Sequence, residues 1–245
     1  AILTGLLILA ISIALVGWFF LFREQAEEIY ASDRDHFHYA SIGTEARAGL
    51  PLYVWEVLPE VFPEKLPVST INRNSDYTRF GMIQEAGKAL PIGISSRVIG
   101  FPRQGINCAI CHTSTFRESS HSVREIVAAG PSSSFDSQSY LRFLFAAAQD
   151  SRFTADHILP VILKHHDLGV VDQLLYRYVL IPQARKGIME QAKLYAWMQS
   201  RPDWGPGRID PFNPVKFNML SLDDDGTVGN SDMMPLRSEE HTSEL

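Results

Sequence analysis

Both cysteines of the 245-residue chain lie in one five-residue run, Cys108-Ala109-Ile110-Cys111-His112. This C-x-x-C-H spacing is the attachment signature of c-type haem. Two thiols at this separation can each add to one haem vinyl group, and the histidine that follows is then held beneath the iron. The run therefore predicts covalent haem c on Cys108 and Cys111, with His112 as the proximal ligand of the iron.

Other uses of two cysteines fit the sequence less well. A structural zinc site takes four ligands, and the chain has no further cysteine to complete one. A thioredoxin-like redox pair is expected beside a βαβ pattern, which does not surround this run. A pair of buried, inert cysteines gives no reason for this spacing or for His112. Haem attachment is therefore the favoured interpretation.

The N-terminal segment is the most apolar part of the chain. Residues 2–22 contain no charged side chain, and about 20 such residues span the hydrocarbon core of a bilayer. A cleavable signal peptide has a shorter apolar region and small residues after it, whereas this run ends in bulky aromatic side chains. A core helix of a globular domain normally has a polar face, which the run lacks. Residues 1–22 are therefore predicted to form a single-pass transmembrane anchor in the plasma (inner) membrane, in contact with lipid.

Changes in composition divide the rest of the chain. Residues 23–41 are polar and are predicted to form a linker, and residues 42–236 the haem domain. Pro51 and Pro59 bracket a short helix, because proline opens a helix readily and disfavours helical backbone in the residue before it. Glycine and proline recur over 81–103, which predicts a loop leading to the C-x-x-C-H run.

Helical patterns follow the run. A stripe of Leu141, Leu144, Phe145 and Ala148 is preceded by capping candidates at 132–137. Further helices are expected after Thr154, over 170–179 with an end before Pro182, and over 183–199. No alternating β pattern of useful length is present. The predicted fold class is mostly α with long irregular loops, preceded by one N-terminal transmembrane helix.

The net charge of −6 and the absence of any cluster of lysine or arginine argue against a nucleic-acid partner. The sequence identifies no particular redox partner protein.

Several segments resemble a known family. Residues 100–113, Gly-Phe-Pro-Arg-Gln-Gly-Ile-Asn-Cys-Ala-Ile-Cys-His-Thr, and Leu-Pro-Ile-Gly at 90–93 are similar to the haem region of large bacterial c-type cytochromes. These cytochromes are related to the di-haem rubber oxygenases and, more distantly, to bacterial di-haem peroxidases. Residues 204–214 and 229–232 resemble the same group, so the likeness extends over about 42–235. The resemblance implies a cytochrome-c-like fold, export across the plasma membrane to the periplasm, and two haems.

This chain has one C-x-x-C-H run where the family usually has two. Residues 237–245 are abruptly polar and resemble a translated sequencing adapter, so they are predicted to be a non-native tail. The first residue is not methionine. We therefore expect the natural protein to continue beyond Leu236 and to contain a second C-x-x-C-H run.

The sixth position of the iron decides between electron transfer and reaction with oxygen or peroxide. The sequence does not choose among the methionines and histidines outside the run, and each has an ordinary structural alternative. The candidates are Met82, Met189, Met198, Met219, Met233, Met234, His121, His157, His165 and His166.

Other side chains are weaker candidates. Arg97, Arg103 and Arg208 are suited to haem propionates, and Trp204, Phe212 and Phe217 to lining a haem pocket, although surface and core roles are as plausible. A loose match to a calcium-binding loop has Ser221, Asp223, Asp225, Gly226 and Asp232 at the ligand spacing. Its flanks are not helical, so an ordinary turn is favoured.

The leading hypothesis is a membrane-anchored c-type cytochrome that transfers electrons through covalent haem. The alternative is the haem-containing part of a di-haem peroxidase or oxygenase, so enzymatic activity is left open. A haem-based sensor or binding module is a third class.

Overall fold

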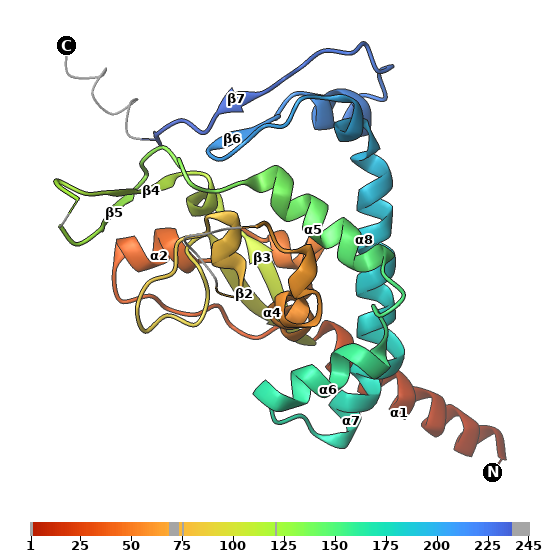
Figure 1. Cartoon of the computed structure of the whole chain (residues 1–245). Coiled ribbons are helices and arrows are strands. Elements are labelled where there is room, and N and C mark those ends of the chain that lie inside the picture. Colours follow the sequence, from red (N-terminus) through yellow and green to blue (C-terminus); the bar gives the residue numbers. More distant parts are fainter. Residues whose placement is uncertain (1, 69–73, 75, 121, 237–245) are drawn as a thin grey trace.

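The computed structural model describes residues 2–68, 74, 76–120 and 122–236. About half of the chain is helical, and the strands form small antiparallel sheets (Figure 1). Up to residue 106 the elements are α1 (Ile2–Phe22), α2 (Asp33–Tyr39), α3 (Thr44–Ala48), β1 (Leu50–Pro51), α4 (Leu52–Val61), the 3₁₀ turns η1 (Pro63–Lys65) and η2 (Tyr77–Phe80), β2 (Ile94–Ile99) and β3 (Phe101–Ile106). The predicted tail, 237–245, lies outside the described residues.

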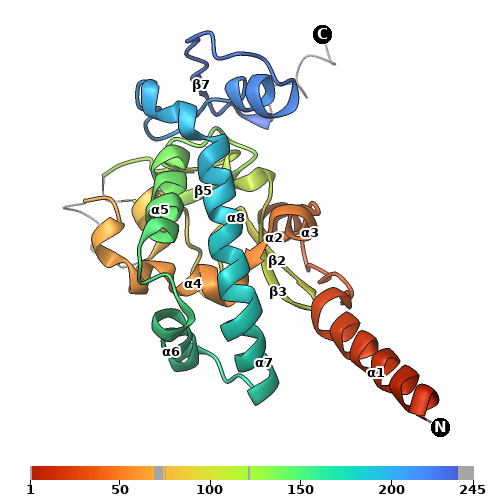
Figure 2. The same ribbon diagram turned by 90° about the vertical axis from the view of Figure 1, so that its right-hand side faces the viewer.

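The later elements are η3 (Cys108–Ile110), β4 (Thr113–Phe116), β5 (Glu125–Ala128), α5 (Ser137–Gln149), α6 (Ala155–His165), α7 (Val170–Leu175), the π-helix η4 (Tyr176–Leu180), α8 (Ile181–Leu194), the 3₁₀ helix η5 (Ala196–Ser200), β6 (Arg208–Ile209), the π-helix η6 (Val215–Met219) and β7 (Ser231–Asp232). Strands β4 and β5 pair with each other, as do β6 and β7. Helices α5 and α8 pack side by side (Figure 2).

A β-hairpin occupies part of the segment that was predicted to be a loop. Strands β2 and β3 pair across Gly100, whose φ of 73° places it in the left-handed region that glycine tolerates. β1 joins the other side of β3 at Arg103 and Gln104 only, so Pro102 lies where β3 has a single neighbour. The same glycine and proline that indicated a loop are thus compatible with strands. The mostly α prediction is wrong, because helices are combined here with small antiparallel sheets.

Helix α4 continues through Pro59 to Val61, beyond its predicted end. A proline cannot donate to the carbonyl four residues earlier, which is that of Trp55. That carbonyl instead accepts a hydrogen bond from the Tyr77 hydroxyl at 2.5 Å. The side chain replaces the missing backbone donor, and the helix does not end.

A second proline is accommodated by a change of helix type. α7, η4 and α8 follow one another without a break, although Pro182 was expected to end the helix. In the π-helical turn the amide of Ile181 donates to the carbonyl of Tyr176, five residues earlier. Such turns shift the hydrogen-bond register locally, so the chain stays helical on both sides of the proline.

The apolar N-terminal segment forms α1, which projects away from the other helices (Figures 1 and 2). Within the described part of the chain, no helix is both long enough and apolar enough to cross a membrane. The predicted single-pass anchor is therefore wrong, and with it the inner-membrane and periplasmic placement.

The segment predicted to be a linker is folded onto the hairpin and contains α2. The amide of Gly100 donates to the carbonyl of Arg23 at 2.7 Å, and that of Gln25 donates to Val98 at 3.0 Å. Further along, His38 and Tyr39 are buried. Residues 23–41 therefore form part of the domain surface and contribute to its packing.

The main hydrophobic core lies among α4, α5, α6 and α8 and contains a cluster of aromatic rings. Trp55 and Tyr77 stack with their ring centroids 3.9 Å apart. The indole Nε1 of Trp55 donates to the hydroxyl of Tyr140 at 2.9 Å, and all three residues are at most 4 % exposed. A buried indole N–H without an acceptor is costly, so this pairing holds α4 against α5.

Replacement of Tyr140 tests that pairing. Tyr140→Phe keeps the ring but leaves the Trp55 N–H buried without its acceptor, so we expect the free energy of unfolding to fall by about 1–3 kcal/mol. Tyr178→Phe, at a side chain that is 70 % exposed, should change it by less than about 0.5 kcal/mol. Urea unfolding followed by circular dichroism measures both, and equal losses would contradict the assignment.

Candidate cofactor site

The C-x-x-C-H run folds as a tight turn, η3, that leads directly into β4. The amides of Cys111 and His112 both donate to the carbonyl of Cys108, at 3.3 Å and 3.1 Å. Cys108 is exposed and Cys111 is half-buried, and both are free thiols. The turn thus brings together the two thiols and the imidazole that the sequence predicted to act as one site.

The residues between the cysteines anchor the turn to the interior. Ile110 is part of the main core, and Ala109 packs with Tyr39 and Ile92 in a smaller cluster beside α2. Ala109 is only 1 % exposed, whereas Cys108 on the same turn is exposed. The turn is therefore held from its buried side, and Cys108 stays accessible to solvent.

Asn107 fixes the start of the turn. Its Oδ1 accepts a hydrogen bond from the amide of Ala109 at 2.9 Å, as an N-cap side chain does. Its Nδ2 donates to the carbonyls of His38 and Ala40, at 3.2 Å and 2.9 Å. One buried amide thereby joins the turn to the end of α2. The sequence interpretation missed this residue, although an asparagine before a short helical turn is a recognised capping signal.

Gly93 provides the room that the turn needs. Its amide donates to the carbonyl of His38 at 2.9 Å, and its own carbonyl accepts from the amide of Asn107 at 3.0 Å. A Cβ at this position would lie 2.3 Å from the Cα of Ile110, and the φ of 87° is left-handed. Only glycine fits here without displacing the turn. This role was also missed, because the contact involves residues distant in sequence.

His112 is oriented by the C-terminal part of the domain. Its Nδ1 lies 2.6 Å from the main-chain carbonyl oxygen of Met234. A carbonyl can only accept, so Nδ1 bears the hydrogen and the lone pair of Nε2 is available. Metal-binding histidines typically donate their second ring nitrogen to a carbonyl or carboxylate in this way. The observed contact therefore suits His112 to ligation through Nε2.

The environment of Cys111 disfavours the thiolate form of its side chain. Burial, assisted by the nearby Cys108, raises the pKa of the Cys111 thiol to about 11. Reactive dithiols and zinc ligands require thiolates, which are favoured by a lowered pKa. Among the described residues, no group of three or more histidine, cysteine or acidic side chains is arranged to hold a metal ion. A porphyrin supplies four nitrogen ligands itself, so a single protein imidazole suffices for haem.

Most of the methionine candidates for the sixth iron position are packed in or against the core. Met82, Met198 and Met233 are buried in the main core, and Met189 packs against it. Met219 and Met234 are exposed. Met234 contacts His112 through its main-chain carbonyl. His121 lies outside the described residues.

The other histidine candidates are bonded to neighbours along α4 and α6. His165 pairs with Glu60 at 2.7 Å, and His166 pairs with Glu56 at 2.8 Å. His157 contacts the hydroxyl of Thr154 at 3.0 Å. The structure does not bring any of these three rings to the C-x-x-C-H turn.

The three arginines considered for haem propionates have protein partners. Arg97 forms ion pairs with Glu24 and Glu27, at 2.7 Å and 3.1 Å. Arg103 donates to the backbone carbonyls of Ile99 and Leu21. Arg208 pairs with Asp232 at 3.0 Å. Of the aromatic candidates, Trp204 is buried, Phe217 packs edge-on against Trp197, and Phe212 is 60 % exposed.

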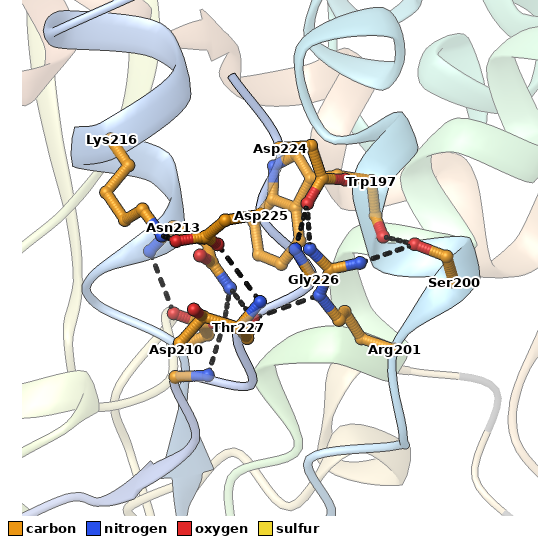
Figure 3. A network of polar contacts seen from close by, with 11 residues as sticks. Trp197, Ser200, Arg201, Asp210, Asn213, Lys216, Asp224, Asp225, Gly226 and Thr227 are labelled. Atoms are coloured by element: carbon orange, nitrogen blue, oxygen red, sulfur yellow. Dashed lines mark hydrogen bonds and ion pairs between the residues drawn. The ribbon is translucent and has the colours of Figure 1, made fainter. Parts of the chain in front are cut away.

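The acidic loop considered for calcium, residues 221–232, is held in place by ion pairs (Figure 3). Asp225 contacts Lys216 through both carboxylate oxygens at 2.6 Å, and Asp224 pairs with Arg201. The buried Asp210 accepts hydrogen bonds from the side chain of Asn213 and from nearby backbone amides. Asp224 and Asp225 thus neutralise neighbouring cations, whereas Asp210 is paired with neutral amide donors.

No protein-family model, curated protein or solved structure matches the chain. The resemblance to bacterial c-type cytochromes therefore stays a prediction, and the geometry around the C-x-x-C-H turn has to support any function assigned to it.

The role of Gly93 can be tested by adding one methyl group. Gly93→Ala would place a Cβ against the backbone of Ile110 and strain a left-handed residue, so we expect the free energy of unfolding to fall by more than about 2 kcal/mol. Gly87→Ala is the matched control: its φ is 78°, but nothing lies within 4 Å of the added Cβ. It should cost only about 1 kcal/mol. Urea unfolding measures both, and similar losses would refute the steric argument.

Proposed function

We propose that the chain is a c-type cytochrome domain that binds haem covalently and transfers electrons. Cys108 and Cys111 would form the thioether bonds, and His112 would be the proximal ligand. The main support is the contact between His112 Nδ1 and the Met234 carbonyl, at 2.6 Å, in a turn that also presents two free thiols. In the neutral imidazole, this contact favours the tautomer with its hydrogen on Nδ1 and its lone pair on Nε2, which is the form that binds iron.

The residues around the turn have separate tasks in this proposal. Haem, when bound, supplies a one-electron redox centre. The Met234 carbonyl fixes the rotation of the His112 ring and increases the basicity of its Nε2. Asn107 and Gly93 hold the turn so that the thiols and imidazole keep their mutual positions. Because Cys108 is exposed, a haem joined to it has an edge near the surface, where a redox partner can approach.

A second candidate is the haem-containing part of a di-haem peroxidase or oxygenase. One observation favours it: the described histidine candidates for the sixth iron position are bonded to other residues away from the turn. The described methionine candidates are packed in or against the core, or are exposed. An iron with an open position can bind oxygen or peroxide, whereas one closed by methionine or histidine favours electron transfer.

Covalent attachment is tested by removing the thiols. In Cys108→Ala/Cys111→Ala, haem staining on a denaturing gel should disappear, because no thioether bond can form. Ser133→Ala, at an exposed position between the turn and α5, should stain like the wild type. His112→Ala should retain stain but give an altered or unstable spectrum, since the fixed axial bond is lost. Stain that persists in the double variant would refute the proposal.

Carbon monoxide distinguishes the two candidate functions. Addition of carbon monoxide to the reduced protein should leave the absorption spectrum unchanged if a sixth ligand closes the iron for electron transfer. A rapid shift of the Soret band would show an open position and would favour the peroxidase or oxygenase. The His112→Ala variant serves as a positive control, because it exposes an axial position by design.

A further inference from the structure

Strand β2 is only partly paired along its outer edge. Its other side is bonded to β3 over the whole strand. On the outer side, the amide of Gln25 donates to the carbonyl of Val98 at 3.0 Å. The amide of Gly100 likewise donates to the carbonyl of Arg23 at 2.7 Å. Within the described chain, no backbone hydrogen bond joins residues 26–31 to β2, so the pairing stops at Val98 although the strand begins at Ile94.

The unpaired part of this edge carries main-chain groups that face outward. In an antiparallel ladder, alternate residues of a strand direct their N–H and C=O groups to the same side. The Val98 carbonyl faces the chain that follows α1, so the main-chain groups of Ser96, two residues earlier, face the same edge. Pro102, which lies opposite Val98 on β3, has no N–H to donate, as expected where Val98 faces away from β3. An edge with free N–H and C=O groups is a template for a further strand.

A cleft of about 410 Å³ lies beside this edge. It is enclosed by residues 28–31, by α2 and by residues 88–96, and Ser96 lies on its wall. Ile94 and Tyr39, which are at most 8 % exposed, also line it. Ligand-binding clefts are typically about 300–1,000 Å³. The free edge of β2 is therefore accessible, and it has a partly apolar surface beside it.

The charges around the cleft favour a basic residue in its occupant. The Nζ of Lys88 lies 3.0 Å from Asp35 and 5.0 Å from the centroid of the Tyr39 ring, so the charge of this lysine is compensated. Arg97 on β2 pairs with two other glutamates that follow α1. Glu28 also lines the cleft and has no ion pair within the described residues. One negative charge is thus left uncompensated in the cleft.

We propose that the outer edge of β2 binds an extended peptide segment of a partner protein, which adds a strand beside residues 94–98. Its main chain bonds to Ser96 and to the amide of Val98, an apolar side chain covers Tyr39, and a lysine or arginine pairs with Glu28. Strand addition of this kind takes its affinity from main-chain hydrogen bonds and its specificity from pockets for alternate side chains. None of the residues that line the cleft belongs to the C-x-x-C-H turn, so the proposal does not depend on haem.

The test uses a peptide of alternating valine and threonine with one lysine, labelled with fluorescein and amidated at its C-terminus. Valine and threonine favour extended backbone. The full-length protein is added up to about 1 mM, and binding is followed by fluorescence polarisation. The peptide is expected to bind, whereas the same peptide with all its amides N-methylated is not, because it has no N–H donors. Equal binding of both peptides, or binding of neither, would overturn the proposal.

Two substitutions at one position test whether the peptide lies on the β2 edge. Ser96→Pro removes the outward N–H and should weaken binding about tenfold. Ser96→Ala keeps that N–H and should bind like the wild type. Equal affinities of the two variants, each shown to be folded by circular dichroism, would contradict the edge as the binding site.

Glu28→Gln tests the charge preference and gives a second comparison if Ser96→Pro does not fold. It should weaken the lysine peptide about twofold to fivefold, since an exposed ion pair is lost. It should leave unchanged the affinity for a peptide with glutamine in place of lysine. Glu125→Gln, at an exposed position of β5, is the control and should affect neither peptide. Equal effects of the two variants on the lysine peptide would remove Glu28 from the site.

Hydrogen exchange distinguishes a partner peptide from the other possible occupants of the edge. The amides of Ser96 and Val98 should exchange rapidly in the free protein and become protected when the peptide is added. Protection without peptide that is independent of protein concentration would assign the edge to residues 26–31 of the same chain. Protection that rises with protein concentration would assign it to a second copy. Either of these two results would overturn the partner peptide.

Discussion

The position of the C-x-x-C-H turn depends on the buried side chain of Asn107. Its three hydrogen bonds cap the turn and hold it to the end of α2. Each bond is worth only about 0.5–1.5 kcal/mol net, but an unmet amide in this environment would cost more. Gly93, which immediately precedes β2, donates to the same His38 carbonyl. This one carbonyl therefore connects the end of α2 to both the start of β2 and the turn. The turn that carries the two thiols is thereby bonded to two neighbouring segments.

The opposite side of the site is supplied by the C-terminal part of the domain. There the Met234 carbonyl reaches His112, and the amide of Leu236 donates to the carbonyl of Ala129 at 2.9 Å beside β5. The C-terminal segment is held in turn by β6–β7 pairing and by the ion pairs of the acidic loop. The orientation of the His112 imidazole thus depends on residues more than a hundred positions away in the chain. The candidate site is therefore completed by tertiary contacts.

The candidate site could be recognised in the sequence because its residues are close together in the chain. Two cysteines and a histidine within five residues need no long-range information to be recognised. Asn107 and Gly93 were not found, since their partners at His38 and Ala40 are far away in the chain. The β2–β3 hairpin was not predicted, because the effects of Gly100 and Pro102 depend on which strands lie beside them.

The predicted ends of two helices were wrong for a related reason. Pro59 and Pro182 are breakers in isolation, but a tyrosine hydroxyl compensates for the first, and a π-helical turn precedes the second. Helix α1 was correctly expected as an apolar segment and wrongly interpreted as a membrane span. Apolar composition alone therefore did not determine the role of a segment.

The attachment of the α1 segment to the β2–β3 hairpin places the projecting helix one strand away from the candidate site. The chain leaving α1 is bonded to the hairpin tip at Gly100, and the other end of β3 leads through Ile106 to Asn107. Strand β3 therefore runs directly from the point where the α1 segment is bonded to the base of the C-x-x-C-H turn.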